Sequence, residues 1–226
     1  MNRALIVAAI LIVLGGGYAL YKGLTRLPAV SQALPGIQVA TATEWEEADT
    51  YRIDAKYPQF GIASIDTSVK ALVEEAAAQF KEDVVAGPPL PDSAVSQYEF
   101  ESMFDSAYVG LDVVSAKLVV STYTGGAHGN AVLYGLNYER ETGRPLTLDD
   151  ALTMIGLTLD EVAERAKAEL SATLGADIIA PEGADPTAEN YSTFVIGPEE
   201  VTFIFQLYQV APYAAGVQEV SFPRVE

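Results

Sequence analysis

Cysteine is absent from this 226-residue chain, and histidine occurs once. Without cysteine the protein has no disulfide, no cysteine-based zinc site and no thiol nucleophile. The single histidine, His128, is the one imidazole that could act as a general base, and the sequence has no Gly-x-Ser-x-Gly turn to carry a serine nucleophile. The sequence shows neither the ligand cluster of a zinc hydrolase nor the glycine-rich loop of a nucleotide-binding protein. It therefore predicts no metal, no cofactor and no enzymatic activity.

Carboxylates are the one catalytic group in plentiful supply. A glycosidase needs only two of them. Because the chain has 31 Asp and Glu residues, their presence does not identify any particular catalytic pair. Asp149 and Asp150 are explained by a helix N-terminus, where the helix dipole favours negative charge. Glu199 and Glu200 are explained by a solvated turn. A carboxylate-based hydrolase stays open as a lesser alternative.

Positive charge is scarce after Leu27. All 31 acidic residues follow this position, together with 10 of the 13 Lys and Arg residues, which leaves a net charge of −21 (10 − 31). Such a surface repels phosphate, so nucleic acid is not expected as a partner, whereas cationic proteins would be attracted. Half of the residues are apolar, which is enough for a sizeable core and argues against disorder.

Residues 4–21, near the N-terminus, carry no charged side chain. Residues 4–21 would form about 27 Å of uncharged helix, enough to cross a bilayer core. Lys22 and Arg26 follow as an interfacial anchor. We expect residues 1–26 to be a retained signal anchor, with the acidic part outside the cytoplasm. The alternative is a signal peptide cleaved at Gly17-Tyr18-Ala19, which would leave a secreted or periplasmic protein.

The remaining pattern predicts an α+β protein, with a mainly antiparallel sheet and two or three packed helices after the transmembrane helix. Residues 27–42 contain two prolines and no charge, and are expected to form a stalk. Apolar spacing predicts helices, the last of them opened by a capping box of Thr158 and Glu161. The predicted helices span residues 66–83, 147–156 and 158–175, and the predicted strands span 49–57, 96–108, 113–123, 132–138, 191–196, 201–210 and 217–222.

A glycine-rich loop, residues 124–130, joins the two strands of the clearest hairpin. Its histidine, His128, is either a ligand contact or general base, or a ring that bonds the backbone and pins the loop. Tyr213 lies in a segment that is either an exposed binding edge or a connector packed on the sheet. The candidate ligand-binding residues are Thr124, Gly125, Gly126, His128 and Tyr213.

These segments resemble a known pair of domains. The run Tyr123-Thr124-Gly125-Gly126-Ala127-His128-Gly129, the segment from Glu141 to Leu148 and the tail from Tyr208 to Gly216 are similar to the domain of unknown function in the anti-sigma factor RsiV. Tyr57-Pro58 and the following helix resemble the companion domain of PdaC-type peptidoglycan deacetylases. The resemblance implies a PdaC-like subdomain at residues 43–110 and an RsiV-like subdomain at 111–226.

The resemblance implies recognition rather than catalysis. The ectodomain of RsiV binds lysozyme, and PdaC-type proteins deacetylate peptidoglycan with a separate catalytic domain. We therefore expect a membrane-tethered module of the bacterial cell envelope that recognises a cationic protein such as lysozyme. The alternative is a module that binds cell-wall glycan through exposed tyrosine rings.

Overall fold

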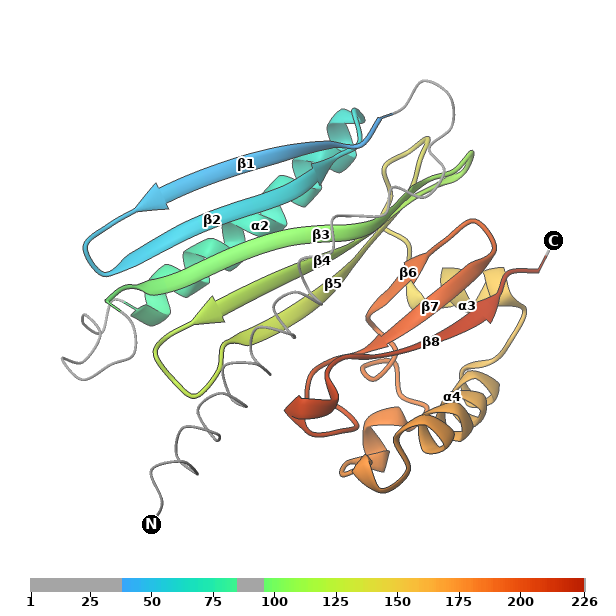
Figure 1. Ribbon diagram of the computed structural model, residues 1–226. Coiled ribbons are helices and arrows are strands. Elements are labelled where there is room, and N and C mark those ends of the chain that lie inside the picture. Colours follow the sequence, from blue (N-terminus) through green and yellow to red (C-terminus); the bar gives the residue numbers. More distant parts are fainter. Residues whose placement is uncertain (1–37, 85–95, 226) are drawn as a thin grey trace, which may run out of the picture.

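The computed structural model describes residues 38–84 and 96–225, which form two β-sheets and three α-helices (Figure 1). The first sheet has the order β1 (Ala40–Glu47), β2 (Tyr51–Gln59), β3 (Tyr98–Val109), β4 (Val113–Tyr123) and β5 (Asn130–Glu139), with α2 (Ala63–Val84) between β2 and β3. Helices α3 (Leu148–Ile155) and α4 (Leu159–Leu174) precede a second sheet of β6 (Phe194–Ile196), β7 (Glu200–Phe205) and β8 (Gln218–Pro223). The predicted α+β class is confirmed.

The predicted signal anchor and most of the predicted stalk lie outside the described residues. So does the Gly-Pro-Pro turn at residues 87–89, which the sequence predicts as the stop of the first helix. Within residues 38–84 and 96–225, no helix is long and apolar enough to cross a membrane.

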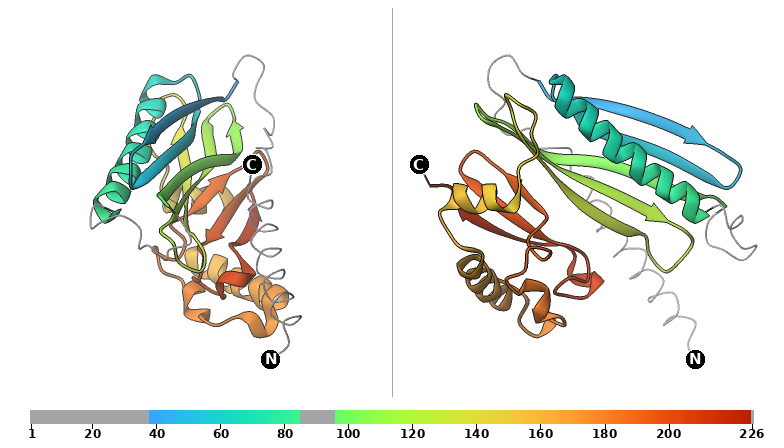
Figure 2. Two further views of the ribbon diagram at one scale, coloured as in Figure 1. Left: turned by 60° about the vertical axis from the view of Figure 1, so that its left-hand side comes forward. Right: turned by 180° about the vertical axis from the view of Figure 1, so that it is seen from behind.

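Helix α2 makes the first sheet mixed rather than antiparallel throughout. Three strand pairs are antiparallel, as the sequence predicts, but β2 and β3 run parallel. A parallel pair needs a crossover connection, and α2 supplies it along one face of the sheet (Figure 2). The predicted division between residues 110 and 111 falls in the turn between β3 and β4, which pair within this one sheet. The division itself stays a prediction.

Strand β1 is a polar edge strand without the apolar alternation that would reveal it in the sequence. Its first residues, 40–42, belong to the segment predicted as a stalk. Side chains hold it in place: Glu44 accepts hydrogen bonds from Tyr57 Oη at 2.7 Å and from Lys70 Nζ at 2.8 Å. Glu46, two residues along, makes equivalent contacts with a tyrosine of β2 and a lysine of α2.

Both C-terminal helices begin where the sequence predicts. The predicted capping box of α4 is confirmed, because Thr158 Oγ1 accepts from the Glu161 N–H while the Glu161 carboxylate accepts from the Thr158 N–H. Gly156 ends α3 with φ 66°, a left-handed conformation that glycine adopts without strain. The two helices pack on one face of the second sheet.

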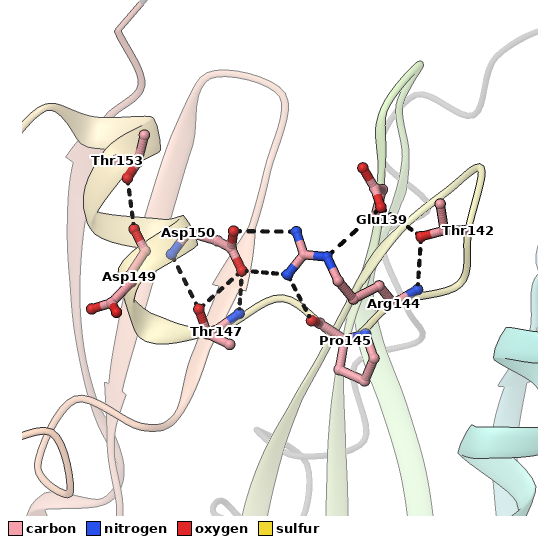
Figure 3. A network of polar contacts seen from close by, with 8 residues as sticks. All are labelled: Glu139, Thr142, Arg144, Pro145, Thr147, Asp149, Asp150 and Thr153. Carbon is pink, nitrogen blue, oxygen red and sulfur yellow. Dashed lines mark hydrogen bonds and ion pairs between the residues drawn. The ribbon is translucent and has the colours of Figure 1, made fainter.

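Arg144 connects the end of β5 to the start of α3 (Figure 3). Its guanidinium contacts the Asp150 carboxylate at 2.9 and 3.2 Å, and it lies 3.7 Å from the Glu139 carboxylate on its other side. Asp150 also accepts a hydrogen bond from the Thr147 N–H at 2.8 Å, as part of the α3 capping box. Arg144, and then Thr147, hold the pKa of the Asp150 carboxyl well below its usual range.

Four carboxyl groups whose pKa is lowered in the folded protein, Asp150 among them, are expected to make its stability sensitive to acid. The pKa is lowered in the folded protein, so each contribution is present above the unfolded value, about 4 for Asp and Glu, and is lost as the pH falls through the folded value. Thermal unfolding followed from about pH 7 to about pH 3 should show a falling Tm, with a shallower slope for Asp150→Asn. Equal slopes for the two proteins would contradict this origin. The carboxyls with lowered pKa are Glu44, Glu46, Asp150 and Glu161.

The second sheet joins the C-terminal helices to the first sheet. Its residues alternate between two cores, as strand residues do. Phe203 and Phe205 lie in the core shared with α3 and α4, while Ile204 between them packs against Val119 and Leu133 of the first sheet. The second sheet therefore covers β4 and β5 on the face opposite α2 (Figure 2).

A buried network of hydrogen bonds from Ser115 and Asn137 fixes the contact between the two sheets. Ser115 Oγ donates to Asn137 Oδ1 at 2.7 Å and accepts from the Ile196 N–H at 2.9 Å. Asn137 Nδ2 donates to the Phe194 carbonyl at 2.7 Å. The same carbonyl oxygen lies directly over Gly135, where a Cβ atom would be 1.8 Å away. The first sheet therefore satisfies backbone groups of β6, and only glycine permits this close approach.

Candidate functional site

Three aromatic rings from different parts of the chain meet at the tip of the β4–β5 hairpin. His128 stacks on Tyr213, with ring centroids 3.8 Å apart and an interplanar angle of 17°. The centroid of Tyr208 is 5.8 Å from that of Tyr213, and the Tyr208 hydroxyl lies 3.2 Å from His128 Nε2. We call these three residues the aromatic cluster. Tyr208 is 51% exposed, so the cluster presents aromatic surface to solvent.

Hydrogen bonds orient the His128 ring within the cluster. Its Nδ1 lies 2.8 Å from the Gly129 carbonyl oxygen, which can only accept, so we assign the proton to Nδ1. In the neutral ring Nε2 is then an acceptor for the Tyr208 hydroxyl. The ring thus bonds the loop backbone, as one of the two interpretations of His128 predicts, and it also belongs to an exposed cluster. A role of His128 as a ligand contact or general base stays a prediction.

The structure brings two of the five candidate residues into contact, His128 and Tyr213. The other three, Thr124, Gly125 and Gly126, lie in the turn of the same loop, where Gly125 has φ 87° and requires glycine. These three residues shape the loop that carries His128. Their contact with a ligand stays a prediction.

Tyr208 belongs to the cluster but is not among the predicted site residues, because the sequence pattern places it in a strand. The sequence predicts a strand over residues 201–210, but β7 ends at Phe205. Tyr208 then adopts φ 66°, an unfavourable left-handed conformation for a bulky side chain, which places its ring beside His128. The one sequence signal for it is the tail segment from Tyr208 to Gly216, which contains both tyrosines of the cluster.

A groove of about 650 Å³ begins beside the aromatic cluster. One side is formed by six consecutive residues of β5, residues 130–135, which follow His128 closely in the chain. Because strand side chains alternate between faces, a consecutive run lines a groove only where the groove follows the strand edge. The rest of the lining comes from α2 and from two C-terminal segments, namely Leu72, Glu189, Asn190, Ser192, Thr193, Gln206, Leu207 and Gln209. None of the three cluster rings lines the groove, but Asn130 follows His128 by two residues, and Leu207 and Gln209 flank Tyr208. We therefore treat the groove and the cluster as neighbouring parts of one candidate site.

The groove carries little charge, although the chain has a net charge of −18. Glu189 is the one charged residue in its lining, and no Lys or Arg borders it. Its other polar side chains are carboxamides and hydroxyls, namely Asn130, Asn190, Gln206, Gln209, Ser192, Thr193 and Tyr134. Such a lining offers no cation for a phosphate ligand, and it suits a neutral ligand rich in hydroxyl and amide groups.

Hydrogen bonds to the backbone hold these carboxamides in fixed positions. Gln206 Oε1 accepts from the Leu133 N–H at 2.9 Å, and its Nε2 donates to the Leu133 carbonyl at 2.7 Å. Gln209 Nε2 donates to the carbonyls of Gly183 at 2.8 Å and Asn190 at 3.0 Å. The groove is therefore preorganised, which lowers the entropic cost of binding.

Two family models match separate parts of the chain. A model described as "Deacetylase PdaC" matches residues 44–131, and one described as "Protein of unknown function (DUF3298)" matches residues 155–224. The predicted resemblance to PdaC-type domains is confirmed, and that to RsiV stays a prediction. His128 lies in the first matched region and both tyrosines in the second, so the aromatic cluster forms where the two regions meet.

Similar proteins include a curated relative and two solved structures. Over 189 residues the chain is 24% identical to "Peptidoglycan-N-acetylmuramic acid deacetylase PdaC" of Bacillus subtilis, which covers 82% of the chain and 40% of that protein. A DUF3298 family member from Bacteroides fragilis has a TM-score of 0.52 at 19% identity, covering 83% of this chain and 90% of its own. A DUF3298 family protein from Pseudomonas aeruginosa has a TM-score of 0.54 at 21% identity, covering 85% and 91%. These structures show the same fold.

The prediction that this chain is not an enzyme is contradicted by these comparisons. Both the matched family description and the name of the curated relative point to an enzyme. The chain spans about two fifths of that relative. In the described ranges no three His, Asp or Glu side chains gather where they could hold a metal ion.

Proposed function

We propose that this protein takes part in peptidoglycan deacetylation at the cell envelope, and that the groove and the aromatic cluster bind the glycan strand. This proposal rests on an exposed aromatic cluster whose chain neighbours, Asn130, Leu207 and Gln209, line a groove rich in carboxamides and hydroxyls. Sugar rings have apolar C–H faces and hydroxyl edges, which match aromatic rings and fixed polar side chains. Similarity to a peptidoglycan-N-acetylmuramic acid deacetylase supports the substrate class.

The location and size of the site also support glycan binding. A volume of about 650 Å³ lies within the usual range for ligand sites and would accommodate several sugar rings in an open groove. Residues 4–21, whether a membrane anchor or a cleaved signal, would place the groove outside the cytoplasm, where peptidoglycan lies.

Co-sedimentation with purified peptidoglycan tests this function. We expect the protein to pellet with the sacculi, and to do so even at about 0.5 M salt, because the groove is nearly uncharged and screening has little to weaken. Acetate released in the same samples would measure deacetylation directly. Protein that stays in the supernatant at every salt concentration would contradict glycan binding.

The acidic surface supports a second candidate, recognition of a cationic protein such as lysozyme. A net charge of −21 after Leu27 would steer a basic partner by long-range attraction. This attraction is screened by salt, so retention on immobilised lysozyme should be lost at about 0.5 M salt. The opposite salt responses therefore separate this candidate from glycan binding.

A further inference from the structure

We infer that the groove recognises the N-acetyl group of the sugar through the backbone N–H and C=O of Ala131, which both point away from β4. Acetylated glycan would therefore bind more tightly than deacetylated glycan. This inference rests on the proposed function, because it concerns the same groove. It identifies the acetamido group as the part of the sugar that the site recognises. It also predicts that the site binds the substrate of a deacetylation more tightly than the product.

The direction of the Ala131 backbone follows from its neighbours. In an antiparallel pair, the backbone groups of successive residues alternate between the partner strand and the open side. Both backbone groups of Leu133 point away from β4, since they bond to Gln206. The Asn137 carbonyl also points outward and accepts from the Leu146 N–H at 2.9 Å. Ala131, two residues before Leu133, therefore directs its N–H and C=O into the groove that it lines.

The Gln206 side chain shows that the free edge of β5 can bind an amide group through its backbone N–H and C=O. Its side-chain carboxamide accepts from one backbone N–H and donates to one backbone carbonyl, both of Leu133. The next outward position toward the aromatic cluster is Ala131, whose backbone groups bond to no side chain or loop of the described residues. One amide position on the edge is thus filled by the protein itself, and the adjacent one, beside Asn130, is open to a ligand.

An acetamido group and a free amine would form different hydrogen bonds with the backbone groups of Ala131. The acetamido carbonyl accepts the hydrogen bond that the Ala131 N–H offers. A deacetylated sugar carries an amine that is mainly protonated at about pH 6, by analogy with α-amino groups, and an ammonium group has only donors. The Ala131 N–H would then face another donor, and an unpaired buried donor is costly.

Long-range electrostatics oppose this preference, because the acidic protein attracts a cationic sugar. The opposing effect depends on distance and salt. At about 0.15 M salt the Debye length is about 8 Å, so most surface carboxylates are screened from a ligand in the groove. The one charged residue of the lining, Glu189, is exposed to solvent. We therefore expect the local hydrogen bond to decide the preference at this or higher salt.

Calorimetry with three neutral or cationic tetrasaccharides tests the inference on the unmodified protein. The probes are the tetramer of N-acetylglucosamine, its fully deacetylated counterpart, and cellotetraose, which has a hydroxyl in place of the acetamido group. At about pH 6 we expect the acetylated tetramer to bind about tenfold more tightly than the other two, equivalent to ~1.4 kcal/mol. Equal affinities, or a preference for the amine, would overturn the inference.

Ala131→Pro removes the donor itself. Proline lacks the backbone N–H and is tolerated on an edge strand where that N–H faces away from the ladder. We expect the tenfold preference to disappear while cellotetraose affinity is kept. Ala131→Ser retains the N–H and is the matched control, and circular dichroism checks that both variants fold. A preference that survives in folded Ala131→Pro would also overturn the inference.

Failure of the inference is distinguishable from failure of the proposed function. Protein that pellets with peptidoglycan but shows no preference among the tetrasaccharides, or binds none of them, retains glycan binding and loses the acetamido contact. Protein that neither pellets with peptidoglycan nor binds any tetrasaccharide loses both.

Discussion

Replacing Gly135 with alanine is expected to destabilise the protein by about 3 kcal/mol or more, which is at the upper end for a single substitution. A Cβ atom at this position would lie 1.8 Å from the Phe194 carbonyl oxygen, so β5 and β6 must separate. Separation also strains the bond from Asn137 Nδ2 to the same carbonyl. Urea unfolding would measure the loss of stability.

Gly126→Ala provides the matched control in the same hairpin. A Cβ atom there would meet its nearest neighbour at 3.8 Å, an ordinary contact distance, so we expect little change in stability. If Gly135→Ala unfolds at the same urea concentration as the unmodified protein, the close approach of the two sheets is wrong. The glycan site would then lose its structural basis, since the aromatic cluster joins the β4–β5 loop of the first sheet to the β7–β8 connection of the second.

Replacing Tyr213 with alanine is expected to weaken glycan binding about thirtyfold, equivalent to ~2 kcal/mol. Tyr213 stacks on His128 and is in contact range of Tyr208, so its removal dismantles the cluster rather than one contact. Aromatic residues at the centre of a binding surface commonly carry this much binding energy. Calorimetry with peptidoglycan fragments would measure the change.

Trp45→Ala tests whether this effect is specific to the cluster. Trp45 is an exposed aromatic residue, at 59% exposure, but it lies on β1 and does not line the groove. We expect its replacement to leave glycan affinity unchanged. If Trp45→Ala weakens binding and Tyr213→Ala does not, the binding surface is on the first sheet away from the cluster.

Local signals in the sequence account for much of the fold. The capping box of Thr158 and Glu161 and the alternation of the β4–β5 hairpin predict elements that the structure contains, because they depend on nearby residues alone. Strand β1 could not be predicted in this way. Its residues are polar, and it is held by contacts with β2 and α2, such as that between Glu44 and Lys70, which the local pattern does not reveal.

The candidate site could be predicted only in part. Its two singled-out members, His128 and Tyr213, stand out as a lone histidine and a tyrosine in a proline- and glycine-bounded segment. Their contact depends on the docking of the two sheets, which is set by buried groups such as Asn137 and Gly135. The groove depends on the same docking. Gln206 gives no sign in the sequence that its side chain caps the edge of a distant strand.

Backbone amide NMR during titration with the N-acetylglucosamine tetramer tests glycan recognition by this site most directly. We expect the largest shifts at Ala131, at the residues flanking Gln206, and at the three members of the aromatic cluster. Shifts that grow with ligand at these positions and leave β1 unaffected would support the site. Shifts confined to other surfaces, or none at saturating concentrations of the tetramer, would contradict it.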